Sequence, residues 1–589
     1  MDPFLLETLK HPLSAPFLIL LQIALLIYIF IFVKSKIIKE FTSQYLSTKS
    51  RIIAIIILYT FFFSSVFLLF FKMTSIPEGS YETDDGSVVI SAFLIKNELK
   101  DSTEKILPYY PYFNIKIHKE NYQSLNQRGI PMYFQIFTQY FTEPGFFSLR
   151  LECTLLMLIT SVSLFLSMFL ITENITYSTL CASLFNILPW TKVLSRITPE
   201  TTSYCYASGI FLLSIFFLVK YKNKLGIVFY IVSLLILYLS YAPGLLLAPL
   251  CGVIIPLILF VHSKDYKKTG KSLFFFSMIF LFLVTLYMKD DLGLKSSLER
   301  AQGIQGLAGV SNFDFNALYN TLSEKAKFYT ANFIAYLLPQ FLFINGDANS
   351  RHNCNTDGQL FIVLGIAFYL GLFSLIWKRD RSLNLTLLLV FLLLSIIPAS
   401  ICLEGSLEKI TQLPLHSLRA SSALPPITII SVLGLIRIID HKAGISFLYV
   451  FFLILNIFSF YNYYFYTYPN TVIRAFDDRT LKESSALALY TIKQQPQRKL
   501  FYSTPFTSLQ YHNAKTIGTK SILNGDGLLS NVYNFEERGD IKIEPNDIIL
   551  VHEPWPYDLL KGYKYDFIKR FPNPKVHGGF GSSVLVIIK

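Results

Sequence analysis

Long apolar runs constrain the fold of this chain more than any other feature of its sequence. A helix needs about 20 apolar residues to cross the hydrocarbon core of a bilayer, and the 589-residue chain is 52% hydrophobic and only 15% charged. This pattern predicts a polytopic α-helical membrane protein. Twelve spans are expected, at residues 15–33, 52–71, 148–171, 175–190, 203–219, 225–241, 244–261, 272–288, 358–376, 383–401, 421–438 and 445–465.

The short connections between these spans differ in their content of Lys and Arg. One set of alternate connections holds 17 basic residues, and the opposite set holds five. Because basic connections stay in the cytoplasm, the first set is predicted to be cytoplasmic. The formal net charge of +13 therefore reflects topology, and no nucleic-acid partner is expected. The segments predicted to face away from the cytoplasm are 72–147, 191–202, 289–357 and 467–589.

Three regions follow from hydropathy and charge. Residues 1–51 are predicted to form an N-terminal span with a cytoplasmic loop, residues 52–466 a transmembrane domain, and residues 467–589 a small soluble α/β domain on the outer face. The aromatic run 131–141 suits either an interfacial helix or a segment packed on the bundle. Short strands are expected in the last region at 499–502, 547–551 and 583–588.

The ionisable residues avoid the middle of the spans and gather at their predicted outer ends. Ion-coupled transporters usually carry charge at mid-depth, so that class is disfavoured. Arg and His can hold a phosphate through N–H donors, and a carboxylate can take a proton from a hydroxyl. One such residue alone would be read as interfacial, but the set suits a reaction on a lipid phosphate. The set comprises Asp84, Asp85, Arg128, Arg150, Lys192, Arg196, Glu200, Asp347, Arg351, His352, His416 and Arg419.

Five groups of short motifs follow one another over residues 50–440. They are ETDDG (82–86) with GIPMY (129–133) and SLRL (148–151); LPW (188–190) with Arg196 and Glu200; FLFINGD (341–347); Arg351-His352 with GQL (358–360); and HSLRA (416–420) before Leu424-Pro425-Pro426. Together they resemble the GT-C-fold glycosyltransferases that use polyprenyl-phosphate sugars. The likeness is to bacterial glycosyltransferase family 39, relatives of the protein mannosyltransferases and of the lipid A aminoarabinose transferase.

The resemblance implies a GT-C-type bundle with its catalytic domain at 52–466 and outer loops at 72–147 and 289–357. It implies a polyprenyl-phosphate-linked sugar as donor, inverting transfer to a hydroxyl acceptor, Asp84 as general base, and Asp85 as a catalytic neighbour that orients a cation or the sugar. No cofactor is required and no metal ligands are predicted, with a divalent metal left open. The predicted donor-phosphate ligands are Arg128, Arg150, Arg196, Arg351, His352, His416 and Arg419, and the predicted sugar or acceptor ligands are Glu200 and Asp347.

The chain departs from the family pattern in three places. Asp84-Asp85 stands where the family usually has Asp-Glu, and Arg128-Gly129-Ile130-Pro131 stands where a Lys-Pro-Pro-like sequence is expected. The span 15–33 precedes the family's usual first span, which puts the N-terminus outside. The resemblance implies an enzyme of the bacterial cytoplasmic membrane, with the site and the C-terminal domain outside the cytoplasm.

Two other functions stay open. A lipid-linked glycan polymerase or ligase also needs Arg and His residues outside the cytoplasm, but it does not need the early acidic pair. A lipid-linked oligosaccharide flippase would need a polar path through the bundle and often an internal repeat, and the sequence indicates neither. The sugar is not determined by the sequence, and the acceptor can be a lipid, a glycan or a protein hydroxyl.

Overall fold

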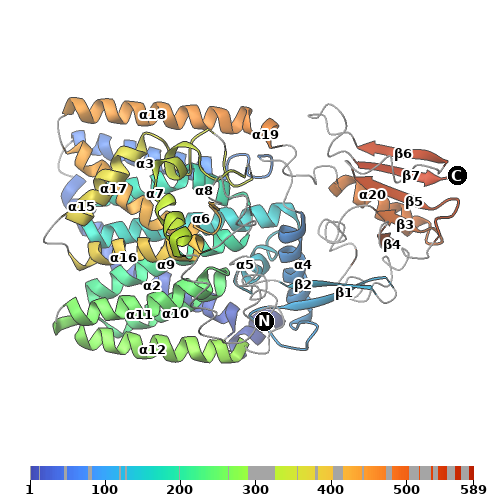
Figure 1. Ribbon diagram of the computed structural model, residues 1–589, viewed down its shortest axis with the longest axis horizontal. Helices are drawn as coiled ribbons and strands as arrows, with labels where there is room; N and C mark the ends of the chain where they lie inside the picture. Colours follow the sequence, from blue (N-terminus) through green and yellow to red (C-terminus); the bar gives the residue numbers. More distant parts are fainter. Residues whose placement is uncertain are drawn as a thin grey trace.

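The computed structural model of the chain is a bundle of long helices followed by a strand-rich C-terminal region (Figure 1). The residues it describes are 2–11, 14–45, 49–76, 82–118, 121–126, 129–197, 199–262, 264–288, 326–349, 351–354, 356–377, 382–401, 415–440, 443–472, 481–502, 517, 532–534, 542–552, 564–571 and 583–589.

Eight of the described helices are long and apolar enough to cross a membrane. A helix suits this setting because it satisfies its own backbone hydrogen bonds in lipid. The eight are α2 (Ala15–Tyr45), α6 (Phe146–Thr172), α9 (Pro199–Tyr221), α11 (Gly244–His262), α12 (Lys264–Met288), α16 (Leu383–Ser400), α17 (Leu424–Ile439) and α18 (Ala443–Tyr466). The chain is an integral membrane protein.

Four other helices, whose described apolar stretches are 10–17 residues long, occupy the other predicted spans. They are α3 (Lys49–Phe70), α7 (Ile175–Ile187), α10 (Lys224–Ser240) and α15 (Leu364–Trp377). All twelve predicted spans therefore overlap helices, although α15 begins six residues after the start of 358–376, and the count of twelve membrane crossings stays a prediction.

Polar residues at the connections define where several helices begin. Asn174 and Asn223 precede α7 and α10, and their side-chain oxygens accept hydrogen bonds from the backbone N–H of Tyr177 (3.2 Å) and Gly226 (2.8 Å). Each cap satisfies a donor that the first helical turn leaves without a partner. These connections can therefore be as short as two residues.

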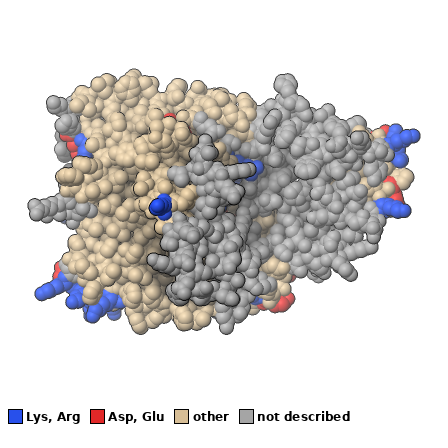
Figure 2. All heavy atoms as spheres, in the orientation of Figure 1, with Lys and Arg blue, Asp and Glu red and all other residues tan. Residues whose placement is uncertain are grey.

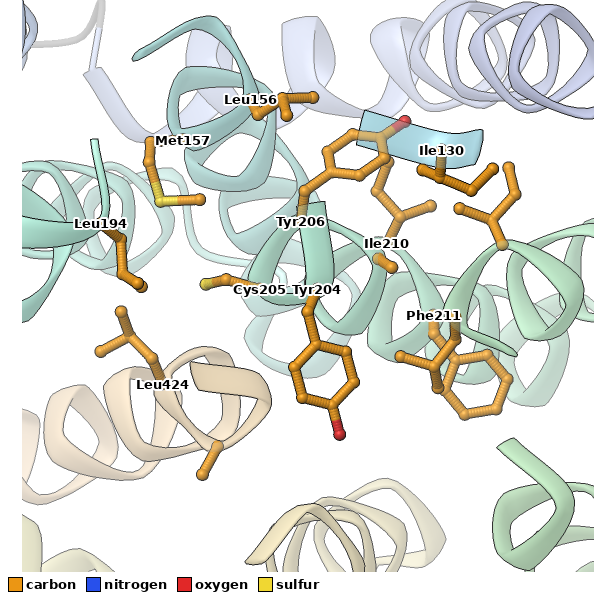
Figure 3. Packing of buried hydrophobic residues seen from close by; sticks show 14 of the residues in the cluster. Ile130, Leu156, Met157, Leu194, Tyr204, Cys205, Tyr206, Ile210, Phe211 and Leu424 are labelled. Atoms are coloured by element: carbon orange, nitrogen blue, oxygen red, sulfur yellow. The ribbon is translucent and has the colours of Figure 1, made fainter. Parts of the chain in front are cut away.

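Helix α9 is the centre of the bundle, and its apolar stretch is entirely buried. It packs against α6, α10, α16 and α17. Figure 3 shows side chains of α9, among them Tyr204, Tyr206 and Phe211, surrounded by residues of α6 and of the start of α17. Small residues allow another close contact, because a Cβ at Gly434 of α17 would lie 1.8 Å from the carbonyl oxygen of Ala367 in α15.

A buried polar triad joins helix α2 to the bundle. The Tyr206 hydroxyl donates to Gln22 Oε1 (2.7 Å), and Gln22 Nε2 donates to Ser233 Oγ (3.4 Å). All three residues are fully buried. The triad ties α2 to α9 and α10 within the apolar part of the molecule.

The two ends of the bundle differ in their charges. At one end, Lys36 of α2 and Lys220 of α9 meet Glu173, and Lys222 meets Asp265 of α12 at 3.7 Å. Basic side chains also gather at the end of the bundle farthest from the C-terminal sheet in Figure 2. Three of the predicted basic connections therefore lie together.

The other end faces the C-terminal sheet and carries several short elements (Figure 1). These elements are α1 (Pro3–Lys10), α4 (Glu82–Glu98), β1 (Tyr112–His118), β2 (Asn121–Asn126), α5 (Gly129–Thr138) and α8 (Pro189–Leu194). Helix α5 is almost wholly buried against α4, α6, α9 and α10. Of the two readings of run 131–141, the packed segment is therefore the one observed.

The described residues of the C-terminal region form two helices, α19 (Tyr468–Thr471) and α20 (Leu481–Gln494), and a five-stranded mixed sheet of order β4-β3-β5-β7-β6. Strand β3 pairs in parallel with β4 and β5, and β7 pairs antiparallel with β5 and β6. The strands are β3 (Leu500–Tyr502), β4 (Val532–Asn534), β5 (Ile548–His552), β6 (Tyr565–Phe571) and β7 (Ser583–Ile588). The three strands predicted from sequence are confirmed, whereas the domain boundary and its outer location stay predictions.

Candidate active site

A buried carboxylate with two histidines lies beside the start of α17. Asp347 follows a π-helical turn, η1 (Gln340–Ile344), and Gly346, whose φ of +67° lies in the left-handed region that favours glycine. A Cβ at Gly346 would also lie 2.5 Å from Asn353 Nδ2. The glycine thus lets the chain turn tightly enough to aim Asp347 back at residues 349–353.

Asp347 is held by partners from two separate segments. Its Oδ1 accepts from the Asn349 N–H (2.9 Å), while its Oδ2 accepts from the Ser417 N–H (2.7 Å) and lies 3.1 Å from His352 Nδ1. Burial would raise the pKa of Asp347, but the hydrogen bond from His352 and the charges of His352 and His416 outweigh it and lower that pKa. Asp347 is therefore an ionised carboxylate at neutral pH.

His416 completes this group from the connection before α17. Its ring centroid lies 4.6 Å from that of His352, and its backbone N–H donates to the Tyr336 hydroxyl (2.9 Å). Ligand atoms of Asp347, His352 and His416 all lie within 4.8 Å of one another. Two imidazoles and a carboxylate are a donor set that can hold a divalent cation such as Zn²⁺. The sequence predicted no metal ligands, because His416 belongs to a different segment and the spacing matches no metal motif.

The segments around this group are connected by backbone hydrogen bonds. Leu360 N–H donates to the Leu342 carbonyl (2.7 Å), and Trp190 N–H in α8 donates to the Gln359 carbonyl (3.0 Å). The close approach requires Gly358, because a Cβ there would lie 2.4 Å from Phe343 N. The π-helical turn before Asp347 is thereby fixed to α8.

Three basic side chains are fully buried near α8, and all three donate to backbone carbonyls in the last turn of α3 or in the segment that follows it. Arg150 comes from the first turns of α6, Lys192 from α8 and Arg196 from the turn after α8. Burial lowers the pKa of Arg196 to about 10, so its guanidinium stays charged at neutral pH. Burial, and then the neighbouring Arg196, lowers the pKa of Lys192 well below its usual value.

The structure describes three of the other predicted site residues. Arg419 is buried in the turn after His416, Arg351 is half-buried beside His352, and Glu200 is half-buried in the first turn of α9. Asp84 and Asp85 lie in the first turn of α4, but their side chains fall outside the described residues. Arg128 also lies outside the described residues.

The structure thus brings together Asp347, His352 and His416, and separately Arg150 and Arg196. Both groups lie near the start of α9. Arg196 comes shortly before α9 and contacts the end of α3. Ser421, which follows the His416 turn, donates to the Thr201 carbonyl in the first turn of α9 (3.1 Å). Lys192, which the sequence did not assign to a ligand, belongs to the second group. The only sequence signal for Lys192 was its position in the connection 191–202, which is predicted to lie outside the cytoplasm.

No protein-family model matches the chain, and no curated protein matches it. A solved structure of ArnT from Cupriavidus metallidurans in the apo state matches with a TM-score of 0.52 at 11% sequence identity, over 90% of this chain and 98% of that one. The chain has a GT-C fold. This confirms the fold that the sequence motifs predicted.

Two other solved structures resemble the chain more weakly. ArnT from the same organism bound to undecaprenyl phosphate has a TM-score of 0.47 at 12% identity, over 92% of this chain and 98% of that one. The Archaeoglobus fulgidus oligosaccharyltransferase, in a complex with Zn and sulfate, has a TM-score of 0.42 at 12% identity, over 90% of this chain and 75% of that one. The assignment of the GT-C fold rests on the apo structure.

Proposed function

We propose that this protein is a membrane glycosyltransferase that moves a sugar from a polyprenyl-phosphate donor to a hydroxyl acceptor outside the cytoplasm. The observation that carries the proposal is the gathering of a buried carboxylate and two histidines, with Arg351 and Arg419 beside them, in a GT-C bundle. Such groups are costly next to a membrane unless they have a function. Neutralising a phosphate and moving a proton is a function that these residue types can perform.

The reaction requires one proton acceptor and stabilisation of one leaving group. Asp84 would take the proton of the acceptor hydroxyl as that oxygen attacks the anomeric carbon, which inverts its configuration. The polyprenyl phosphate leaves as an anion and needs no general acid. Arg351, His352, His416 and Arg419 would stabilise the charge that develops on the leaving oxygen. Asp85, Glu200 and Asp347 are left to orient cations and sugar hydroxyls.

The site belongs outside the cytoplasm in this proposal. Glu173 and Asp265 gather the basic connections at the opposite end of the bundle, and basic connections remain cytoplasmic. Lipid-linked sugars, unlike nucleotide sugars, are available on the outer side. A bacterial cytoplasmic membrane with the C-terminal sheet outside is the expected setting, and no cofactor is expected to be required.

The test is transfer from a radiolabelled polyprenyl-phosphate hexose or aminopentose by the purified protein in lipid vesicles. Wild-type protein should move the label out of the donor lipid, and Asp84→Asn should lower that rate by about 10²–10⁴-fold through loss of the base. Glu98→Gln, at the other end of the same helix, is the matched control and should retain wild-type activity.

Three outcomes would contradict the proposal. Full activity in Asp84→Asn would remove the base assignment. Label that crosses the vesicle membrane while still attached to its lipid would favour a flippase. Activity only on lipid-pyrophosphate glycans would favour a polymerase or ligase.

A further inference from the structure

The end of α3 is enclosed by three buried basic side chains, Arg150, Lys192 and Arg196, which we call the α3 clamp. Lys192 Nζ donates to the carbonyls of Leu68 and Leu69, and Arg196 Nη2 donates to those of Leu69 (2.7 Å) and Phe71 (3.4 Å). Arg150 Nη1 donates to the carbonyls of Met73 and Ile76, both at 3.4 Å. The clamp therefore follows the backbone from the last turn of α3 through residue 76.

These contacts satisfy a specific electrostatic need. The last carbonyls of a helix have no partners within it and carry the negative end of the helix dipole. Helix α3 ends at Phe70, and Lys72 adopts a left-handed φ of 51° that turns the chain away. In the described part of the chain, neither Lys192 nor Arg196 forms an ion pair with a carboxylate. Backbone carbonyls are their principal acceptors.

Helix α18 supports the same segment from another side. The Tyr464 hydroxyl donates to the Ile76 carbonyl (3.3 Å), and Lys192 Nζ lies 5.7 Å from the ring centroids of Tyr464 and Phe465. One turn earlier, the Tyr461 hydroxyl donates to the Ile187 carbonyl at the end of α7 (3.1 Å). Tyr464 therefore contacts the clamped segment, while Tyr461 makes the same kind of bond elsewhere.

We infer that the α3 clamp and Tyr464 are positioning residues, which set where the segment after α3 delivers Asp84 and Asp85. Ile76 is the last described residue before α4, which carries both carboxylates in its first turn. The inference rests on the proposed function, and it replaces the donor-phosphate role that the sequence predicted for Arg150 and Arg196. Their side chains are at most 1% exposed and their described hydrogen bonds go to the protein.

Backbone exchange tests the clamp without any need for catalysis. In full-length protein, Tyr464→Phe and Lys192→Met should speed amide hydrogen exchange in peptides covering residues 68–76 and 82–98 by about two- to tenfold, as expected for loss of one net hydrogen bond. Tyr461→Phe is the matched control and should leave both peptides unchanged. Unchanged exchange in Tyr464→Phe, or equal changes in both tyrosine variants, would overturn the inference.

Transfer kinetics then separates positioning from phosphate binding. Lys192→Met should lower kcat by about 10- to 100-fold through misplacement of the base, with the donor KM and the inhibition constant of free polyprenyl phosphate unchanged. Lys192→Arg should restore most of the rate. A raised donor KM together with weaker inhibition would assign the clamp to the phosphate and overturn the inference. If the wild-type protein transfers no sugar, the proposed function fails, and the exchange experiment still decides on the clamp.

Discussion

Asp357 illustrates how burial against a helix of the bundle controls a single carboxyl group. It lies in the connection before α15, and Asn456 Nδ2 of α18 donates to its two oxygens at 3.4 and 3.1 Å. Burial raises the pKa of Asp357 to about 6, and the hydrogen bond from Asn456 only partly opposes this effect. The folded protein therefore favours the protonated form more than the unfolded chain does.

The pKa of Asp357 predicts a pH-dependent gain in stability for Asp357→Asn. Because the pKa of Asp357 is higher in the folded protein than in the unfolded chain, its protonation contributes fully to the free energy of unfolding below about pH 4. This contribution is lost as the pH rises through about 6. The neutral amide should therefore raise the unfolding temperature at pH 8 and change it little at pH 4.

The control for this experiment is Asp265→Asn, whose carboxylate is 77% exposed in a surface pair with Lys222. Surface pairs contribute little, so this variant should unfold like the wild type at both pH values. An unfolding temperature for Asp357→Asn that falls at pH 8, or rises equally at both pH values, would contradict the prediction.

At the scale of single residues, the sequence identified the chemistry of the site better than its geometry. Asp347, His352 and His416 were selected because carboxylates and imidazoles at outer span ends suit phosphate chemistry. Their convergence depends on Gly346, Gly358 and the pairing of distant segments, which no local pattern encodes. The acceptors of Arg150 and Arg196 are backbone carbonyls, and every residue has one, so the sequence could not distinguish a clamp from a phosphate ligand.

At the scale of elements, the N-terminal helix α1 packs against α5, next to the helix that carries the acidic pair. Phe4 is 1% exposed and packs against the rings of Tyr133, Phe137 and Tyr140 in tilted and edge-to-face arrangements. The Tyr140 hydroxyl donates to Asp2 Oδ1 (2.7 Å), and Lys96 of α4 lies 4.1 Å from the Tyr140 ring centroid. Helix α1 therefore packs on α5, and Tyr140 connects Asp2 at its start to Lys96 of α4.

Phe4→Ala should release α1 from α5. Removing a buried phenylalanine side chain costs about 3–5 kcal/mol, which exceeds what a two-turn helix with one remaining polar contact can offset. Trypsin should then cleave after Lys10 much faster than in the wild-type protein. Leu6 lies on the same helix and is 44% exposed, so Leu6→Ala should leave the cleavage rate unchanged. Equal cleavage in wild type and Phe4→Ala would contradict this docking.

The positions of the long elements were predictable because lipid-facing and buried helices are both apolar over their whole length. The packing of α5 was not, because its aromatic residues suit a membrane interface and a protein core equally well. The three predicted C-terminal strands were recognisable from their aromatic and β-branched residues. Strands β4 and β6 were not predicted, and β4 has only three residues, Val532–Asn534, which give no periodic signal.

At the scale of the whole molecule, the charge asymmetry predicts which surfaces are reached from outside the cell. All five cysteines in the described part of the chain are buried, so introduced cysteines can report on accessibility in a parent protein that carries Cys402→Ser. In intact cells, an impermeant maleimide should label Tyr490→Cys, at an exposed position on α20, and should not label Lys264→Cys before the cells are permeabilised. Labelling in the reverse order would invert the proposed topology.

The triad of Gln22, Tyr206 and Ser233 has a consequence for biogenesis. Gln22 is synthesised 184 residues before Tyr206 and 211 residues before Ser233. At about 5–20 residues per second, the ribosome needs on the order of 10–40 s to supply the first partner. During that interval the amide of α2 must be shielded from lipid by the insertion machinery, by water or by other chain segments. Helix α2 is thus among the helices whose final polar contacts form late, and slowed elongation before residue 206 should expose it to quality-control proteases.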